Sequence, residues 1–587
     1  MKRILSTLLA VVMLVMLISA CQPPEDAPGA ANPAPAAADP APADTAPTDT
    51  APADTAPTDT APTQEAPAEE NPYAELGLVD GRFTETRHIT VEVFDRGLDD
   101  QKTKPEDNYY SNWIKEGVLR DLNIEIEWIT VPRWGEENEI VNLLAAGDTP
   151  DVCVTYNYPA IQEYGEMGGI LDMSPYIDGY KELFPNLWDL LGEYNLHFNK
   201  DPEDGHIWAI EAIIANNSRI NTFVREDWLA ALNIPEPKTL AEFEAMLAAF
   251  KDNAETLLGA DADKMIPFSL GSDVGWRANT LMNSFVPDSI TDREVFIYGF
   301  DDRQFMFPNY KEGVRVLNKW YNDGLIWPDF SIYGAGDATE DNNSKAGFVG
   351  SFIHNWDYPY RNGEDSINSN LKRNFGDAAG FIAIDPFTND SGVPRKFVEG
   401  SVDRKVFFPA TNDEPLASML YVDWISKVEN RKYLQIGDEG VTHTVHDDGS
   451  IEIISALGTE YIQNSPQNID YTITINGLDL GDDSLNGKSL VLSYAGIESR
   501  YVEKAYVAAQ NESRIFPHYN VGAIEAESGM ANPLKEKRDA LLNQAVNASV
   551  ADFDSVFDSG YDDYMASGGQ AIIDARTAAY EQYFGSN

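Results

Sequence analysis

The 587-residue chain is strongly acidic, with 96 Asp and Glu against 42 Lys and Arg and a formal net charge of −54. A field of that sign repels nucleic-acid phosphates, which sets nucleic-acid binding aside, and it favours a soluble monomer. Only two cysteines, Cys21 and Cys153, and seven scattered histidines are present, so neither a disulfide framework nor a histidine-based metal site is indicated.

Residues 1–20 have the features of a secretory signal peptide. Lys2 and Arg3 supply a positive start, residues 4–18 are apolar apart from two hydroxyl side chains, and small residues precede Cys21. A membrane-spanning helix needs about 20 apolar residues, and this run is shorter. Residues 18–21 (ISAC) resemble the bacterial lipobox. This resemblance implies a protein that is lipid-anchored on the extracytoplasmic face of the cell membrane through diacylglycerol on Cys21. Two or more acyl chains are enough to hold a protein stably on a membrane.

Residues 21–72 form a segment rich in Ala, Pro, Thr and Asp. It holds ten acidic and no basic residues, and the units APADT and APTDT alternate four times over residues 41–60. Such a composition cannot bury a core, so we expect a disordered stalk. From position 73 onward, 40 basic and 86 acidic residues remain, a net charge of −46.

The first part of the globular region alternates between strand and helix patterns. Residues 88–94 and 124–128 alternate as strands, residues 109–122 and 136–146 have helical spacing, and residues 151–154 predict a third strand. This order predicts a mainly parallel, open α/β sheet, which binds ligands outside the carboxyl ends of its strands. Cys153, inside the third strand, is expected to be a small buried hydrophobe.

Further helices are predicted at residues 240–251, 311–323 and 414–427, and helical hairpins at residues 552–584. About five hundred folded residues are too many for one core and indicate at least two lobes.

Several segments resemble the extracellular solute-binding proteins of ABC importers, in the large carbohydrate-binding lipoprotein branch of family 1. Residues 145–152 (AAGDTPDV) and 204–210 (DGHIWAI) are similar to its turn-to-strand and hairpin motifs, although Glu211 stands where proline is usual. The other matching segments are residues 224–229 (VREDWL), 239–243 (TLAEF), 317–326 (LNKWYNDGLI), 328–330 (PDF), 421–425 (YVDWI) and 437–441 (GDEGV). The resemblance rests on the order and spacing of these segments, and it extends over residues 85–585.

The resemblance implies an α/β, two-lobed periplasmic-binding-protein-like fold with a hinge and a helical C-terminal region. It places the first lobe at about 85–215 plus a middle segment at about 385–410, and the second lobe at about 216–384 and 411–585. It also implies a carbohydrate ligand, commonly an oligosaccharide, and delivery to ABC permease subunits in the membrane.

No metal or other cofactor is expected. Some relatives carry a calcium loop, but residues 261–267 (DADKMIP) are too short for one and include a lysine. His443 and His446 form the nearest metal-like pair, and they lack the intervening glutamate of a zinc motif.

Sugars present C–H faces that aromatic rings cover, while polar groups bond the hydroxyls. Aromatics in loops are therefore the candidate ligand contacts: Trp134, Tyr156, Trp276, Trp356 and Tyr519. The candidate polar partners are Asn157, Asp273, Arg277, Asn355, Asp357 and Glu399. An acidic lining of this kind would favour neutral sugars over uronates. Trp228, Trp320, Trp327 and Trp424 fall on scaffold motifs and are assigned to the core.

Two other classes of function remain open at this point. A secreted glycoside hydrolase needs two carboxylates about 5 to 9.5 Å apart, and carboxylates are too abundant here for the sequence to exclude such a pair. However, no serine-hydrolase or zinc-protease motif is present, which favours a protein without catalytic residues. The other class is a peptide-binding lipoprotein or a surface adhesin, and the sequence shows no motif that distinguishes it.

Overall fold

The structure is a computed structural model that describes residues 73–96, 104–156, 158–215, 220–299, 303–334, 337–398, 402–454, 470–494, 496–511 and 513–585. The chain divides into two units, Met1–Glu70 and Asn71–Asn587. The signal peptide, Cys21 and the stalk expected from the sequence lie outside the described residues.

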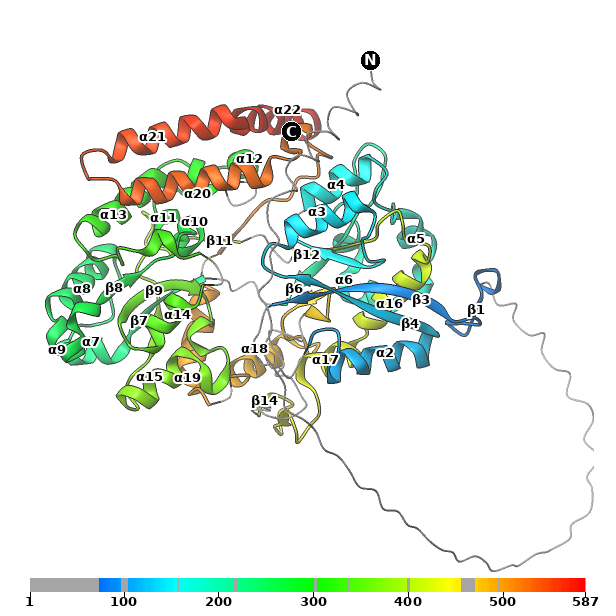
Figure 1. Ribbon diagram of the computed structural model, residues 1–587, viewed down its shortest axis with the longest axis horizontal. Helices are drawn as coiled ribbons and strands as arrows, with labels where there is room; N and C mark the ends of the chain where they lie inside the picture. Colours follow the sequence, from blue (N-terminus) through cyan, green and yellow to red (C-terminus); the bar gives the residue numbers. More distant parts are fainter. Residues whose placement is uncertain are drawn as a thin grey trace, which may run out of the picture. The chain divides into compact units, whose positions relative to one another are not determined.

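The first lobe is built on a mainly parallel sheet (Figure 1). Strand β3 (Arg87–Asp95) pairs in parallel with β4 (Ile124–Pro132), and the Val91–Val152 bridge joins β3 to β5 (Cys153–Thr155). Strand β12 (Val402–Phe407) lies antiparallel between β5 and β6 (Ile210–Ile214), and β15 (Ile475–Asn476) is parallel to β6. The predicted α/β sheet is therefore confirmed, with β12 as its antiparallel strand.

The helices between these strands begin and end where the sequence indicates. Helix α2 (Tyr109–Leu122) starts with a capping box in which the Asn108 side chain accepts from the N–H groups of Tyr110 and Ser111. It ends at Asn123, whose φ of 62° is left-handed. Helix α3 (Glu136–Ala146) ends at Gly147, with φ 74°. The strands and helices predicted between residues 88 and 154 are all present.

The first lobe is completed by helices from two distant parts of the chain. They are α4 (Tyr158–Glu166), α5 (Ser174–Gly179), α6 (Pro185–Leu196), α16 (Pro415–Ser426) and α17 (Val428–Ile436). Helix α16 is buried from Ala417 to Ser426, and its apolar side chains belong to the same core as Val91 and Ile126. The expectation that residues 411–585 all belong to the second lobe therefore needs correction, because α16 and residues 471–473 pack on the first sheet.

The second lobe has a four-stranded sheet in the order β10–β7–β9–β8. Its strands are β7 (Ile220–Arg225), β8 (Ile266–Ser269), β9 (Val349–Asn355) and β10 (Phe381–Ile384). Its helices include α7 (Glu226–Leu232), α8 (Leu240–Asp252), α9 (Ala254–Leu258), α10 (Val274–Arg277), α11 (Asn279–Asn283), α12 (Asp292–Tyr298), α13 (Tyr310–Asn322), α14 (Ala338–Lys345), α15 (Ile367–Phe375) and α19 (Ser499–Ala509). Trp228 and Trp320 are buried in this core and Trp424 in the first, as the motif matches implied, whereas Trp327 is partly buried.

Shorter elements connect and flank the lobes: β1 (Leu78–Val79), β2 (Arg82–Phe83), β11 (Lys396–Val398), β13 (His443–Val445), β14 (Ile451–Ile453), α18 (Asp483–Leu492) and β16 (Ser513–Ile515). Ile436, Ile451, Ile453 and Leu480 form a small separate core around the β13–β14 hairpin.

The C-terminal helices differ in one respect from the predicted hairpins. Helix α21 (Phe553–Tyr564) folds back against α20 (Ala531–Asn547), but α21 continues into α22 (Gln570–Phe584) through a π-helical turn at Met565–Gly569 (Figure 1). Gly568 adopts a φ of 132°, which glycine tolerates, and this allows the irregular turn while the chain continues into α22 without reversing direction. The expectation of a hairpin inside residues 552–584 is wrong for this reason.

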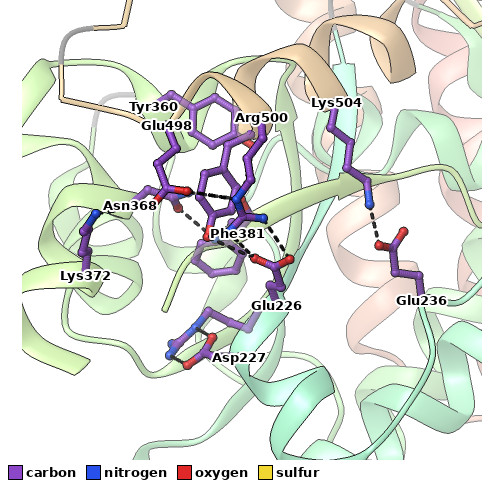
Figure 2. A network of polar contacts seen from close by, with 12 residues as sticks. Glu226, Asp227, Glu236, Tyr360, Asn368, Lys372, Phe381, Glu498, Arg500 and Lys504 are labelled. Atoms are coloured by element: carbon purple, nitrogen blue, oxygen red, sulfur yellow. Dashed lines mark hydrogen bonds and ion pairs between the residues drawn. The ribbon is translucent and has the colours of Figure 1, made fainter. Parts of the chain in front are cut away.

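The chain leaves the first sheet for the last time after β15. Helix α19 then packs against the second lobe. Figure 2 shows Arg500 bonded to Glu226 on α7 and to Glu498, and Lys504 facing Glu236. These charges are largely exposed, so each pair contributes less than about 1 kcal/mol. The larger stabilisation comes from burial of apolar side chains of α19, among them Val502 and Ala505.

The close approach of α13 to α11 gives a first prediction. A Cβ on Gly313 would lie 2.6 Å from the Met282 Cα, a backbone atom that cannot swing aside. We expect Gly313→Ala to cost about 1–3 kcal/mol of stability through overpacking and to lower the midpoint of thermal unfolding.

Gly487→Ala in α18 is the matched control, because the nearest atom to its Cβ is the Tyr506 Oη at 3.5 Å. Alanine is the better helix former by up to about 1 kcal/mol, so this variant should be as stable as the wild type or more so. Equal midpoints for the two variants would contradict the packing described for α13.

Candidate ligand-binding site

The two sheets present their carboxyl ends to the same connecting segments. Strand β6 ends at Ile214 and β7 begins at Ile220, and six Cα–Cα steps can span at most about 23 Å. Ile220 pairs with Asn355, so the end of β9 lies at the start of β7, and β8 and β10 end on the same side as β9. In the first lobe β3, β4 and β5 run parallel to β6 and end on the same side of the sheet as β6. We call these two sets of strand ends the carboxyl edges.

Aromatic rings and a guanidinium group form a stack on the carboxyl edge of the first lobe. The Arg133 guanidinium lies 4.1 Å from the ring centre of Tyr156, 5.2 Å from Trp134 and 5.3 Å from Phe94. These residues follow or end β3, β4 and β5. Trp134 is 57 % exposed, so much of this side chain is available to a ligand. The structure thus brings together Trp134 and Tyr156, two of the residues selected from the sequence.

Glu136 fixes the position of Tyr156. Its carboxylate accepts the Tyr156 backbone N–H at 3.0 Å and the Thr155 hydroxyl at 2.9 Å. Glu136 is buried, and burial raises its pKa. A buried carboxylate with both oxygens bonded to one strand end holds that end rigidly.

Arg96 lies beside this stack and is paired within its own lobe. It forms two hydrogen bonds to Asp470, at 2.6 and 2.8 Å. Its charge also interacts with those of Tyr156 and of Arg361 in the second lobe.

The carboxyl edge of the second lobe is organised by a buried ion pair. Arg277, 5 % exposed, forms a bidentate pair with Glu340 and donates from Nε to the Ile353 carbonyl at 2.8 Å. The Ser269 hydroxyl donates to the same carboxylate at 2.7 Å. Arg277 was selected as a ligand contact, and the structure shows its donors engaged by protein groups. Asp273 lies beside it, at the start of α10, and burial raises the pKa of Asp273.

Three rings stack next to this ion pair. Trp276 meets His354 edge-on at 4.9 Å between ring centres, and Tyr358 stacks on His354 at 3.4 Å. Burial, together with the positive charges of Arg277 and Arg361, lowers the pKa of His354 well below its usual value. A neutral imidazole in this position extends the aromatic surface of Trp276.

The residues after β9 are also engaged by the protein. Asp357 accepts from Arg361 at 2.8 Å and from the Tyr494 hydroxyl at 2.6 Å. Trp356 is 7 % exposed and packs edge-on against Tyr494. The backbone N–H of Asn355 donates to His354 Nδ1 at 2.8 Å.

One of the predicted contact residues, Tyr519, is not brought to these edges by any contact that the structure describes. Tyr519 packs with Phe296, Tyr580 and Phe584. Burial, and after it the hydrogen bond with Tyr580, raises the pKa of Tyr519 to about 12. Asn157 and Glu399 lie outside the described residues.

Sequence reasoning missed the guanidinium groups of Arg96, Arg133 and Arg361. The available signal was their position, since Arg96 and Arg133 each come directly after a strand of the parallel sheet.

No cluster of three or more His, Cys, Asp or Glu side chains with metal-binding geometry occurs within the described ranges. His443 is buried with Nδ1 3.0 Å from the Ile436 carbonyl, whereas His446 is paired with Glu452 at the surface. Cys153 is fully buried, as expected, and burial raises the pKa of its thiol well above the usual value.

A sequence comparison decides the family. The profile described as bacterial extracellular solute-binding protein matches residues 119–431, more than half of the chain. The chain belongs to this family. Its members are solute-binding proteins and not enzymes, so the glycoside-hydrolase alternative is set aside.

Two relatives are similar in sequence to this solute-binding protein. The polygalacturonan/rhamnogalacturonan-binding protein YtcQ of Bacillus subtilis is 22 % identical over 504 residues, which cover 81 % of this chain and 90 % of YtcQ. The fructooligosaccharide ABC transporter substrate-binding protein FusA of Streptococcus pneumoniae is 26 % identical over 229 residues, or 36 % of this chain. That alignment spans only 41 % of FusA.

Solved structures share the fold. The alginate-binding protein AlgQ2 without calcium superposes with a TM-score of 0.60 at 17 % identity, over 85 % of this chain and 98 % of AlgQ2. The FusA EF-hand mutant in complex with fructo-nystose superposes with a TM-score of 0.58 at 16 % identity, over 85 % of this chain and all of that chain. The predicted solute-binding-protein fold is confirmed. In the parts of the chain that the structure describes, no helix has both the length and the apolar character needed to cross a bilayer.

The buried carboxylates behind the first carboxyl edge predict an unusual pH dependence. Glu92 on β3 accepts the Val154 N–H at 2.8 Å, and burial, with a smaller effect from Glu136, raises its pKa well above the usual value. The folded state therefore holds a proton that the unfolded state has lost, and stability falls as the pH rises from the unfolded pKa, near 4.3, to the folded one. We expect Glu92→Gln to exceed the wild type in stability at pH 8, by a margin that shrinks toward pH 5, in denaturant unfolding.

Glu294→Gln is the control of opposite sign. Thr291, through its backbone N–H and then its hydroxyl, lowers the pKa of Glu294, so the stability this group contributes is present above the unfolded pKa and is lost as the pH falls through the folded one. This variant should be slightly less stable than the wild type at pH 8. A Glu92→Gln variant whose margin over the wild type does not change with pH would contradict a raised pKa at Glu92.

Proposed function

We propose that this protein is the lipid-anchored substrate-binding component of an ABC importer, which captures an oligosaccharide between its two lobes and delivers it to a membrane permease. The observation that carries the proposal is the stack of Trp134, Arg133 and Tyr156 on the carboxyl edge of the first lobe. An exposed indole beside a guanidinium and a phenol hydroxyl suits the alternating C–H and hydroxyl surfaces of a sugar.

The printed names of the relatives support a carbohydrate ligand. FusA is described as binding fructooligosaccharides, YtcQ polygalacturonan and rhamnogalacturonan, and AlgQ2 alginate. These ligands are all oligomeric or polymeric sugars, and YtcQ aligns over most of its length.

Capture requires that the lobes move relative to each other. Three segments connect the first sheet and its helices to the second: residues 215–219, 385–401 and 477–498. Closure by rotation about such connections would bring Trp134 and Tyr156 toward Trp276, with the ligand held between them. Asp273, Asn355 and Asp357 would supply polar contacts, and Arg277 and Trp356 would hold the second edge in shape. Asn157, Glu399 and Tyr519 remain candidates from the sequence alone.

Removal of the exposed indole tests this assignment. We expect Trp134→Ala to weaken oligosaccharide binding at least tenfold in isothermal titration calorimetry, because tenfold corresponds to about 1.4 kcal/mol, within the range for a stacked aromatic ring. The panel should include fructo-, malto- and galacturono-oligosaccharides.

Trp188→Ala is the matched control, because the Lys181 ammonium already lies 3.8 Å from its ring centre. Its affinity for sugar should match that of the wild type. Thermal shifts with peptides and none with any sugar in the panel would overturn the carbohydrate assignment in favour of a peptide-binding lipoprotein.

With an anchor at Cys21, residues 21–72 would act as a linker between the membrane and the binding domain. The relative LipO of Bacillus subtilis, 24 % identical over 217 residues, is described as a lipoprotein. A tether confines the binding domain near its permease and raises the effective concentration for delivery, while a long hydrated linker leaves it free to turn.

The second cysteine makes the anchor simple to test. We expect Cys21→Ala to move the protein from the membrane fraction to the soluble fraction of cells, since the lipid chains supply the membrane affinity. Cys153→Ala changes the only other cysteine, which is buried, and should leave the protein in the membrane fraction. A Cys21→Ala protein that stays with the membrane would contradict the anchor.

A further inference from the structure

Three arginines on the two carboxyl edges form ion pairs within the protein. Arg96 is paired with Asp470, Arg277 with Glu340 and Arg361 with Asp357. Each pair joins side chains that are at least partly buried, where an uncompensated charge would be costly. Of the acidic lining expected from the sequence, Asp357 is paired with Arg361, and burial raises the pKa of Asp273, which favours its neutral form.

Arg133 is different. Among the residues that the structure describes, no carboxylate forms an ion pair with its guanidinium, and its Nε is buried without a hydrogen-bond acceptor. The charge of Arg133 lowers the pKa of Glu136, the acid nearest in sequence, against the larger effect of burial, but both Glu136 oxygens accept from Thr155 and Tyr156. The rings of Phe94, Trp134 and Tyr156 hold the group in place, and ring faces attract a cation without neutralising it.

The protein has more than twice as many acids as bases, yet this guanidinium is held rigidly beside an exposed indole. It can therefore bind an anion without first being reordered. We infer that the ligand is an acidic oligosaccharide and that Arg133 binds a uronate carboxylate of it while the same sugar ring lies against Trp134. The fork of the guanidinium matches a carboxylate with two parallel hydrogen bonds, a geometry that a neutral sugar hydroxyl cannot provide.

The negative charge of the whole protein does not prevent this interaction. Charges on the exposed surface are screened over about 8 Å at physiological ionic strength, whereas the contact with Arg133 is direct. The surface charge slows the approach of an anion, and the local pair determines how long it stays.

This inference rests on the proposed function, and the test separates the two. The full-length protein without its signal peptide is titrated by calorimetry with trigalacturonate, with its methyl-esterified form, and with a neutral fructo-oligosaccharide. Esterification removes the charge and leaves the sugar ring unchanged. We expect the acid to bind at least tenfold more tightly than the ester.

Three variants complete the test. Arg133→Gln should lower affinity for trigalacturonate about tenfold to a hundredfold and change affinity for the ester little, while Arg133→Lys should lie between. Arg120→Gln removes the same unit of charge from an exposed pair with Asp121 on α2 and should bind like the wild type. Thermal unfolding confirms that each variant is folded.

The outcomes are distinct. A preference for the acid that is lost in Arg133→Gln and kept in Arg120→Gln supports the inference. Equal binding of acid and ester, or a preference that survives in Arg133→Gln, overturns it and leaves the capture of a sugar standing. Failure of every sugar to bind overturns both.

Discussion

The arrangement of the molecule depends on one topological constraint, the short connection from β6 to β7. Few residues separate Ile214 from Ile220, so the carboxyl edge of the first sheet must lie close to the start of the second. The pairing of Ile220 with Asn355 then puts the end of β9 at the same place. Loops that follow β3, β4 and β5 in one lobe and β8 and β9 in the other are thereby set near one another, although they come from distant parts of the chain.

Side-chain positions at these edges are fixed mainly by charge pairs that reach between elements. Glu340 on α14 holds Arg277 on α10, and the Arg277 Nε reaches the Ile353 carbonyl on β9. Glu136 similarly ties the start of α3 to the end of β5. Buried pairs of this kind are costly to assemble and costly to break, so each makes its local geometry specific. Pre-organisation of this type reduces the entropy cost of ordering the site when a ligand binds.

Much of the fold could be predicted from the sequence because its local signals agree. Between Arg87 and Thr155 the strands alternate, Asn108 caps α2, and Gly147 ends α3, so propensity and pattern point to the same elements. The position of α16 could not be read in this way. Its sequence is apolar on every side, and only the tertiary structure shows that it is buried in the first lobe and not in the second.

Part of the candidate site could be predicted for the same reason. The expectation that aromatic side chains in loops contact the ligand pointed to Trp134 and Tyr156, and the structure places them together. The sequence could not show that Arg277 is engaged by Glu340, sixty-three positions away, or that Arg133 has no such partner among the described residues. Whether a charge is compensated depends on contacts between segments that no local pattern records.

Strand β12 has a consequence for the order in which the molecule assembles. It lies between β5 and β6 in the first sheet, and Phe407 pairs with Cys153, yet the chain reaches it only after passing through the second lobe. Until residues 402–407 have emerged, β5 and β6 have an open gap between them and expose unpaired backbone groups. The amino-terminal half therefore has no route to a complete sheet until the strands of the second sheet have been synthesised. Such long-range closure makes folding slow.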